Sequence, residues 1–244
     1  MKNAVTAERE RFCPGVRNAP NERRFNDKQL ALIAQSLRAH TGWQSLAFDE
    51  DGFLVCPNPQ TISGGSAAAR KLLGEALWGN AAYDLESHPR SQNVKFARLA
   101  RGANFSSQSK SLRISIYPIQ IDLADFRLLT GERTALNAFD PGIAVLHELA
   151  HAIWGLPDAR SEEDEPGECE NYINRIRREL HLPERQSYEA PARPRGLSTR
   201  LIAELCFIRF SEKNGKLRQK RFFLRWDAAR VGGLADAQLA ATMR

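Results

Sequence analysis

The segment DPGIAVLHELAHAIWGLPD, residues 140–158, decides how this chain of 244 residues is organised. Asp140 supplies a capping oxygen, and Pro141 suits the first position of a helix because its missing N–H would have no partner there. Gly155 is the residue type favoured just past a helix end, and a proline two residues later blocks continuation. Apolar residues surround the segment on nearly all sides. The sequence therefore predicts a central, buried helix that begins at Pro141 and ends at Trp154.

Two histidines of this helix, His147 and His151, are four residues apart and so lie on one face, one turn above each other. Such a pair can bind one zinc ion, which in catalytic sites takes three protein ligands and leaves the fourth position to water. Glu148 is rotated about 100° from His147, so it can reach that water without filling a ligand position. We therefore predict a zinc-dependent hydrolase with Glu148 as general base. The alternative, two histidines that only satisfy core hydrogen bonds, is disfavoured because the motif matches its helical context.

The identity of the third ligand stays open. A metzincin pattern would place a Gly three residues and a His or Asp six residues after His151, but those positions hold Trp154 and Pro157. Asp158 comes one place late and is the weakest candidate, because a one-residue shift after a helix end re-aims a side chain.

A second helix is expected to begin near Pro166, with acidic residues around its N-terminus. Glu170 flanks its apolar stripe, whereas Glu168 points further towards solvent. Glu170 is therefore the preferred third ligand and Glu168 the reserve. The alternative is that the acidic run from Asp158 to Glu170 is only the solvated start of a helix. The apolar stripe consists of Cys169, Ile173, Ile176 and Leu180.

His147, Glu148, His151 and Glu170 together resemble the gluzincin group of zinc metallopeptidases, in which a Glu on a later helix completes the His-Glu-x-x-His site. Asn174, one turn past Glu170, stands where gluzincins usually have an Asp that supports a metal-binding His without touching the metal. The resemblance implies an α+β fold, with a small sheet packed on a central buried helix in a zincin-like domain. It also implies Zn²⁺ as cofactor and a protein or peptide as substrate.

The motif VLHELAHA and the later segment IRRELHLPERQSY resemble bacterial effector and toxin metallopeptidases over residues 145–188 only. This resemblance implies an effector that acts in another cell. Zinc peptidases commonly use a Tyr, His or Arg to donate a hydrogen bond to the oxyanion. Tyr188 is the candidate for that role, with His181 and Arg185 as alternatives.

The pattern Ser111–Ile121 predicts an edge strand that is broken at Pro118. Zincin peptidases commonly add an extended substrate to such an edge, although a strand that is simply part of the sheet is an equal alternative. Other expected elements are a helix over 27–40, a hairpin over 45–55 and a helix over 66–77. We expect an extended arm over 1–25, a single domain over 26–235 with its active-site part at about 110–190, and a tail over 236–244.

The segment 205–226 mixes cations with aromatic residues, and Asn214-Gly215 predicts a tight turn, so we expect a basic hairpin. Such a ribbon can bind single-stranded nucleic acid by stacking and charge. We favour the alternative that its aromatic residues pack on the core and its cations remain in water. A second hypothesis for the whole chain is a DNA-associated protease, because SprT-like metalloproteases combine a His-Glu-x-x-His domain with DNA attachment. A third is a zinc-bound structural module without turnover.

Composition gives weaker constraints. The net charge is +6, which is compatible with acidic partners, although nucleic acid is not the favoured partner. No stretch of about 18 apolar residues occurs, and residues 1–11 are polar, so we expect a soluble protein that is cytoplasmic or exported without a conventional signal peptide. Cys13, Cys56, Cys169 and Cys206 are far apart, which favours reduced structural thiols over a disulfide scaffold.

Overall fold

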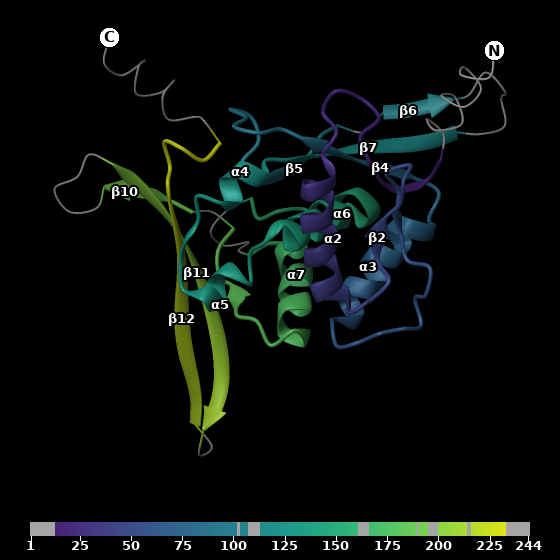
Figure 1. Ribbon diagram of the computed structural model, residues 1–244. Coiled ribbons are helices and arrows are strands. Elements are labelled where there is room, and N and C mark those ends of the chain that lie inside the picture. The colour runs from purple at the N-terminus through teal and green to yellow at the C-terminus, as the bar shows by residue number, and fades with distance from the viewer. Residues whose placement is uncertain are drawn as a thin grey trace, which may run out of the picture.

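The computed structural model describes residues 13–101, 103–106, 113–160, 166–188, 190–194, 200–213 and 216–232. They form a mixed structure of α-helices and β-strands, in which one sheet lies across one end of a group of helices and a second sheet with a long hairpin lies beside them (Figure 1). The helices are α2 (Asp27–Thr41), α3 (Ala67–Trp78), α4 (Leu123–Phe126), α5 (Arg133–Leu136), α6 (Pro141–Trp154) and α7 (Glu168–Glu179). No helix among these residues is long and apolar enough to span a membrane.

The first sheet has the strand order β1-β4-β7-β5, and β6 pairs with β7 on the same side as β5. The strands β1, β4 and β7 are parallel, whereas β5 and β6 run antiparallel to β7. The bounds are β1 (Gly15–Asn18), β4 (Ala82–Ser87), β5 (Ala97–Leu99), β6 (Ala103–Ser106) and β7 (Arg113–Ile121).

The predicted N-terminal arm over 1–25 is wrong for its described part. Residues 15–18 form β1, whose Val16 is fully buried and whose Arg17 forms an ion pair with Asp84 of β4 at 2.7 Å. Phe25 is also buried in the core. Four residues with a central Arg show no period-2 pattern, so the sequence alone does not reveal this strand. Residues 1–12 and 236–244, the remainder of the arm and the predicted tail, lie outside the described residues.

The predicted edge strand is also corrected, because β7 is an internal strand. Pro118 does not interrupt the hydrogen bonds of β7. Its carbonyl accepts from Ala100 N at 2.9 Å, and the carbonyl and nitrogen of one strand residue face the same neighbour, so the nitrogen of Pro118 also faces the segment between β5 and β6. On that side β5 has ended at Leu99 and β6 begins only at Ala103, so no ladder bond is lost. The edge strand next to α6 is β5 instead.

Several local predictions are confirmed. Asn26 accepts the N–H of Gln29 and caps α2, and Gly42 ends that helix with a left-handed conformation. The strands β2 (Ala47–Phe48) and β3 (Leu54–Val55) form the expected hairpin, and Ser66 caps α3. These features depend on residues close together in sequence, which is why the sequence shows them.

The second sheet has the order β10-β11-β12-β8, with β9 paired to β11. The predicted basic hairpin is confirmed as the antiparallel pair of β11 and β12, and its turn at 214–215 lies outside the described residues. The inner half of this hairpin packs its aromatic and aliphatic side chains into a second hydrophobic cluster. The bounds are β8 (Thr130–Gly131), β9 (Glu184–Arg185), β10 (Ala192–Pro194), β11 (Leu201–Lys213) and β12 (Lys216–Asp227).

Helix α6 is central, as predicted. Every residue from Pro141 to Ala150 is buried, and α2, α3, α7 and β5 all pack on it. A glycine permits the closest of these contacts: a Cβ on Gly142 would lie 2.2 Å from Ser36 Oγ of α2, whose hydroxyl instead accepts the Gly142 N–H. Asp140 caps the helix at Ile143 N and accepts from His40 of α2 at 2.8 Å. The helix that carries the two histidines is therefore held on several sides.

Candidate metal centre

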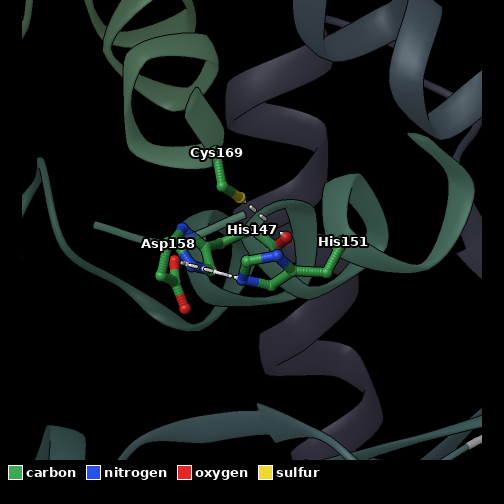
Figure 2. A group of neighbouring side chains, drawn as sticks. All are labelled: His147, His151, Asp158 and Cys169. Carbon is green, nitrogen blue, oxygen red and sulfur yellow. Dashed lines mark hydrogen bonds and ion pairs between the residues drawn. The ribbon is translucent and has the colours of Figure 1, made fainter. Parts of the chain in front are cut away.

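The two histidines of α6 meet a carboxylate from the segment that follows the helix (Figure 2). The Nε2 atoms of His147 and His151 are 3.0 Å apart, and Asp158 Oδ1 lies 3.1 Å from the first and 3.2 Å from the second. Ligand atoms at about 2.05 Å from a tetrahedral zinc are about 3.3 Å from one another. The three atoms form a triangle of nearly that size, so the group can hold a metal ion.

The contacts of the two Nδ1 atoms determine whether each Nε2 atom carries a proton or a lone pair. His151 Nδ1 is 2.5 Å from the carbonyl oxygen of Leu156, which can only accept, so Nδ1 carries the proton. His147 Nδ1 is 3.6 Å from Glu170 Oε2, which favours a proton there as well. In the neutral imidazoles both Nε2 atoms then direct lone pairs towards the Asp158 carboxylate. Lone pairs this close require a cation between them, either protons or a metal.

The chain delivers Asp158 by turning back immediately after α6. Gly155 has a φ of 64° and ends the helix, and its N–H bonds to the carbonyl of His151. The returning segment is tied to α7 by the hydrogen bond from Cys169 N to Pro157 O. A Cβ on Gly167, whose φ is 85°, would lie 2.3 Å from the backbone nitrogen of Ala159. Glycine therefore allows α7 to start directly against the segment that carries the carboxylate.

The protonation of Asp158 follows from these neighbours. Burial opposes ionisation, but hydrogen bonds and charge from His147 and His151 hold the pKa of Asp158 well below its usual range. Burial lowers the pKa of His151, and the contacts with Asp158 raise it more, so its pKa ends above the ordinary value. The carboxylate is ionised at neutral pH, which is the form that binds metals.

Cys169 lies near the same atoms, but its sulfur is not directed to them as a thiolate. Its Sγ is 3.4 Å from the carbonyl oxygen of His147, to which the thiol donates (Figure 2). Burial first, and then the nearby carboxylates, raise the pKa of Cys169 far above neutrality. Its Sγ still belongs to the group of ligand atoms that lie within 4.8 Å of one another, and a bound cation would favour the thiolate. The three donors that already converge are two imidazoles and one carboxylate, and with these three as ligands one tetrahedral position stays open.

The predicted third ligand, Glu170, is not among the converging atoms. It is fully buried on α7 and approaches His147 at Nδ1, the nitrogen on the opposite side of the ring from Nε2. Its carboxylate pairs with Arg177 and with Arg185 Nη1, the latter at 3.1 Å. Burial opposes ionisation of Glu170, but these two guanidinium groups hold its pKa well below the usual range. The reserve ligand, Glu168, is exposed at the start of α7 and lies outside the group.

Asn174 supports the two arginines instead of a histidine. Its Oδ1 accepts from Arg177 Nη1 and from the backbone N–H of Arg185, both at 2.8 Å, and its Nδ2 donates to the carbonyl of Arg185. Arg177 in turn donates from Nε to Ala138 O at 2.9 Å. These two arginines were not singled out as a pair in the sequence. The signal that could have found Arg177 is its position on the same helical side as Glu170.

Glu148 lies beside the histidines on the side of β5. Its Oε2 accepts the backbone N–H of Leu99 at 2.7 Å, so one carboxylate oxygen is anchored to the edge strand. Burial raises the pKa of Glu148, against the opposing influence of His147 and His151. A raised pKa moves this carboxyl group towards the range useful for proton transfer near neutral pH.

Of the three candidates for oxyanion binding, only Tyr188 packs its side chain against a histidine of the metal centre. The ring stacks on His147 with 6.0 Å between centroids, and its hydroxyl lies close enough to Asp158 for that carboxylate to raise its pKa. Burial raises the pKa of Tyr188, so the phenol keeps its proton. Arg185 lies 5.0 Å from the centroid of the same ring but is engaged with Glu170. His181 is exposed past the end of α7, and its carbonyl accepts from Arg209.

A cavity of about 490 Å³ opens next to His147 and Glu148. Its wall is formed by α6, α7, β5 and the inner part of the hairpin, and it is lined by apolar side chains and several cations. Phe96, Phe139 and Ile143 contribute apolar surface. A substrate group of side-chain size therefore has space directly beside the candidate general base.

In comparisons with protein-family models, curated proteins and solved structures, nothing matches this chain. The gluzincin and effector resemblances therefore stay predictions that rest on short motifs.

Proposed function

We propose that the chain is a zinc-dependent hydrolase that cuts peptide bonds, with His147, His151 and Asp158 as ligands. The observation that carries the proposal is the triangle of two Nε2 atoms and Asp158 Oδ1, with sides of 3.0, 3.1 and 3.2 Å. Two imidazoles and a carboxylate are a donor set that zinc accepts, and three protein ligands are typical of catalytic sites. In this proposal the zincin-like fold is inferred from α6, with its motif, and from the sheet beside it.

The chemistry follows from the neighbours of the triangle. A zinc ion bound here would lower the pKa of a water molecule towards neutrality and polarise the substrate carbonyl. The Glu148 carboxylate takes a proton from the water that attacks the carbonyl carbon and then gives a proton to the leaving nitrogen. The bond from Leu99 N to Glu148 fixes the direction of that carboxylate. Tyr188, protonated at neutral pH, donates its hydroxyl to the oxyanion.

A peptide is favoured as the substrate because an open strand edge and a cavity both adjoin Glu148. The strand β5 pairs only with β7 among the described strands, and its Leu99 contacts Glu148 directly. An extended chain added to the free edge of β5 would pass the general base. The adjoining cavity would then receive one of its side chains.

The first experiment measures the zinc content of the purified wild type beside His147→Ala and Asp158→Ala. The wild type should bind one equivalent, and each variant should lose most of it, because a tetrahedral site with two ligands is weak. A wild type that binds no zinc refutes the proposal. A wild type and an Asp158→Ala variant with equal zinc affinity refute the third-ligand assignment alone.

The second experiment separates an enzyme from a zinc-bound structural module. Glu148→Gln should retain the zinc and lose hydrolysis of unfolded casein by about 10²–10⁴-fold, the range typical of general-base catalysis. Equal hydrolysis in wild type and variant shows that Glu148 is not the base. Zinc binding without any hydrolysis by the wild type, over a set of unfolded proteins, favours the structural module.

A further inference from the structure

The outer half of the hairpin of β11 and β12 projects away from the helices (Figure 1). Between Arg209 and Arg221 the sequence contains six lysines or arginines and one acidic residue, Glu212. This part of the hairpin contributes nothing to the metal centre. The metal centre therefore does not account for its charge.

The strand register sorts these residues onto the two faces of the ribbon, because successive residues of a strand point to opposite faces. The positions on one face, which we call the cationic face, are the cross-strand pairs Arg209 with Lys220, Ser211 with Arg218 and Lys213 with Lys216. Glu212 belongs to the other face, opposite Leu217. Five of the six positions on the cationic face are thus basic and none is acidic.

This arrangement does not favour the stability of the hairpin. Like charges directly opposite each other in an antiparallel pair are destabilising. The ring of Phe222 offsets part of the repulsion, because Arg209 and Lys220 lie 5.6 and 5.0 Å from its centroid. Arg218 and Lys220 are exposed and form no ion pair with a carboxylate of the described residues. Their charge is available to an anionic partner.

The distribution of apolar side chains indicates which anionic partner fits. Single-stranded nucleic acid needs exposed aromatic rings among the cations. Phe222, the aromatic residue nearest the cationic face, is buried, whereas the exposed Phe210 pairs with Gln219 on the other face. A membrane surface would need apolar residues and cations on one face, but Phe210 and the exposed Leu217 both lie opposite the cationic face.

We propose that the cationic face of the β11–β12 hairpin binds double-stranded nucleic acid through its phosphates. A two-stranded ribbon fits the major groove of a DNA duplex, and a row of lysines and arginines along it matches the charge of the backbone. The proposal is independent of the metal centre. It differs from the hypothesis drawn from the sequence, in which cations and aromatic residues together bind single-stranded nucleic acid. The strand register places the exposed ring of Phe210 on the face opposite the cations, so the two cannot act together.

The test is the binding of the full chain to a fluorescently labelled DNA duplex of mixed sequence, followed by anisotropy between 50 and 200 mM salt. Arg209 donates to the carbonyl of His181, so the other four basic positions of the cationic face are expected to contact phosphates. The slope of log K against log salt should then be about −3 to −4. Arg218→Gln with Lys220→Gln should reduce the slope by about 2 and weaken binding at 50 mM salt roughly tenfold or more.

The matched control is Arg24→Gln with Lys28→Gln, which removes the same charge from an exposed region near the start of α2. It should bind the duplex as the wild type does, and neither double variant should lower the unfolding temperature. The proposal is overturned by an absence of duplex binding at 50 mM salt, or by an equal loss in the control. Tighter binding to a single strand of the same length, or binding to phosphatidylserine vesicles but not to DNA, also overturns it.

Discussion

Replacing Glu170 with glutamine tests whether this carboxylate supports the metal centre or binds the ion. Glu170 is fully buried and faces Arg177 and Arg185. Glutamine keeps the shape and an acceptor oxygen but removes the charge, which leaves two largely buried guanidinium groups without their counter-charge. Breaking a buried ion pair by removing one partner costs about 3–5 kcal/mol. For a chain of this size, the unfolding temperature should fall by roughly 6–20 °C.

The effect on zinc should be smaller than the effect on folding. The Oε2 atom of Glu170 is 3.6 Å from His147 Nδ1, so the variant loses the group that orients this imidazole but keeps all three converging donors. Loss of such an orienting partner typically weakens metal binding by about 10–100-fold. Asp158→Asn, which removes the charge of a converging donor, should weaken it considerably more.

Two measurements check this reasoning. Thermal unfolding in the presence of a chelator gives the folding effect without metal, and competition with a chromophoric chelator gives the zinc affinity. Glu168→Gln is the matched control, because Glu168 is an exposed carboxylate on the same helix, and it should change the free energy of unfolding by less than about 0.5 kcal/mol. If Glu170→Gln abolishes zinc binding while Asp158→Asn keeps it, the roles of the two carboxylates are reversed.

Three further variants test other parts of the structure. Tyr188→Phe should lower hydrolysis by about 10²–10³-fold with zinc retained, and an unchanged rate means that Tyr188 is not the oxyanion donor. Gly167→Ala should displace the backbone of Ala159, lower the free energy of unfolding by about 1 kcal/mol or more and weaken zinc binding; wild-type affinity would contradict this. Burial raises the pKa of Asp125 to about 6, so the native state binds more protons than the unfolded state between about pH 4 and 6, and stability should fall as pH rises through that window. Asp125→Asn should remove this loss of stability, because asparagine does not titrate, while its side-chain oxygen can still accept from Phe96 N. If urea unfolding of the variant still shows lower stability at higher pH in this window, another group is responsible.

The sequence predicts the centre of the site because the information is local. The capping residue Asp140, the spacing of the two histidines and Gly155 all lie within one helix and its ends, and a helix converts such spacings directly into geometry. The same holds for α7, whose buried side was correctly expected to carry Glu170.

The third donor could not be predicted in this way. Asp158 reaches the histidines only because the chain reverses after Gly155 and is then fixed against α7, through Pro157 O and the close approach at Gly167. These contacts join residues on two different elements. A helical extrapolation from His151 therefore misplaces Asp158, and β1 was missed for the same reason, since its burial depends on β4, more than 60 residues later.

The choice between the two carboxylates follows from what surrounds each of them. Glu170 already has two guanidinium groups as partners, so its charge is compensated before any ion arrives, and its oxygens are occupied. Asp158 has the two histidines as partners and lies near the hydroxyl of Tyr188, and none of these three groups carries a positive charge when the imidazoles are neutral. Even a partly buried carboxylate without a counter-charge is unfavourable unless it coordinates a metal or binds protons. The uncompensated carboxylate, and not the more deeply buried one, is therefore the one expected to bind the ion.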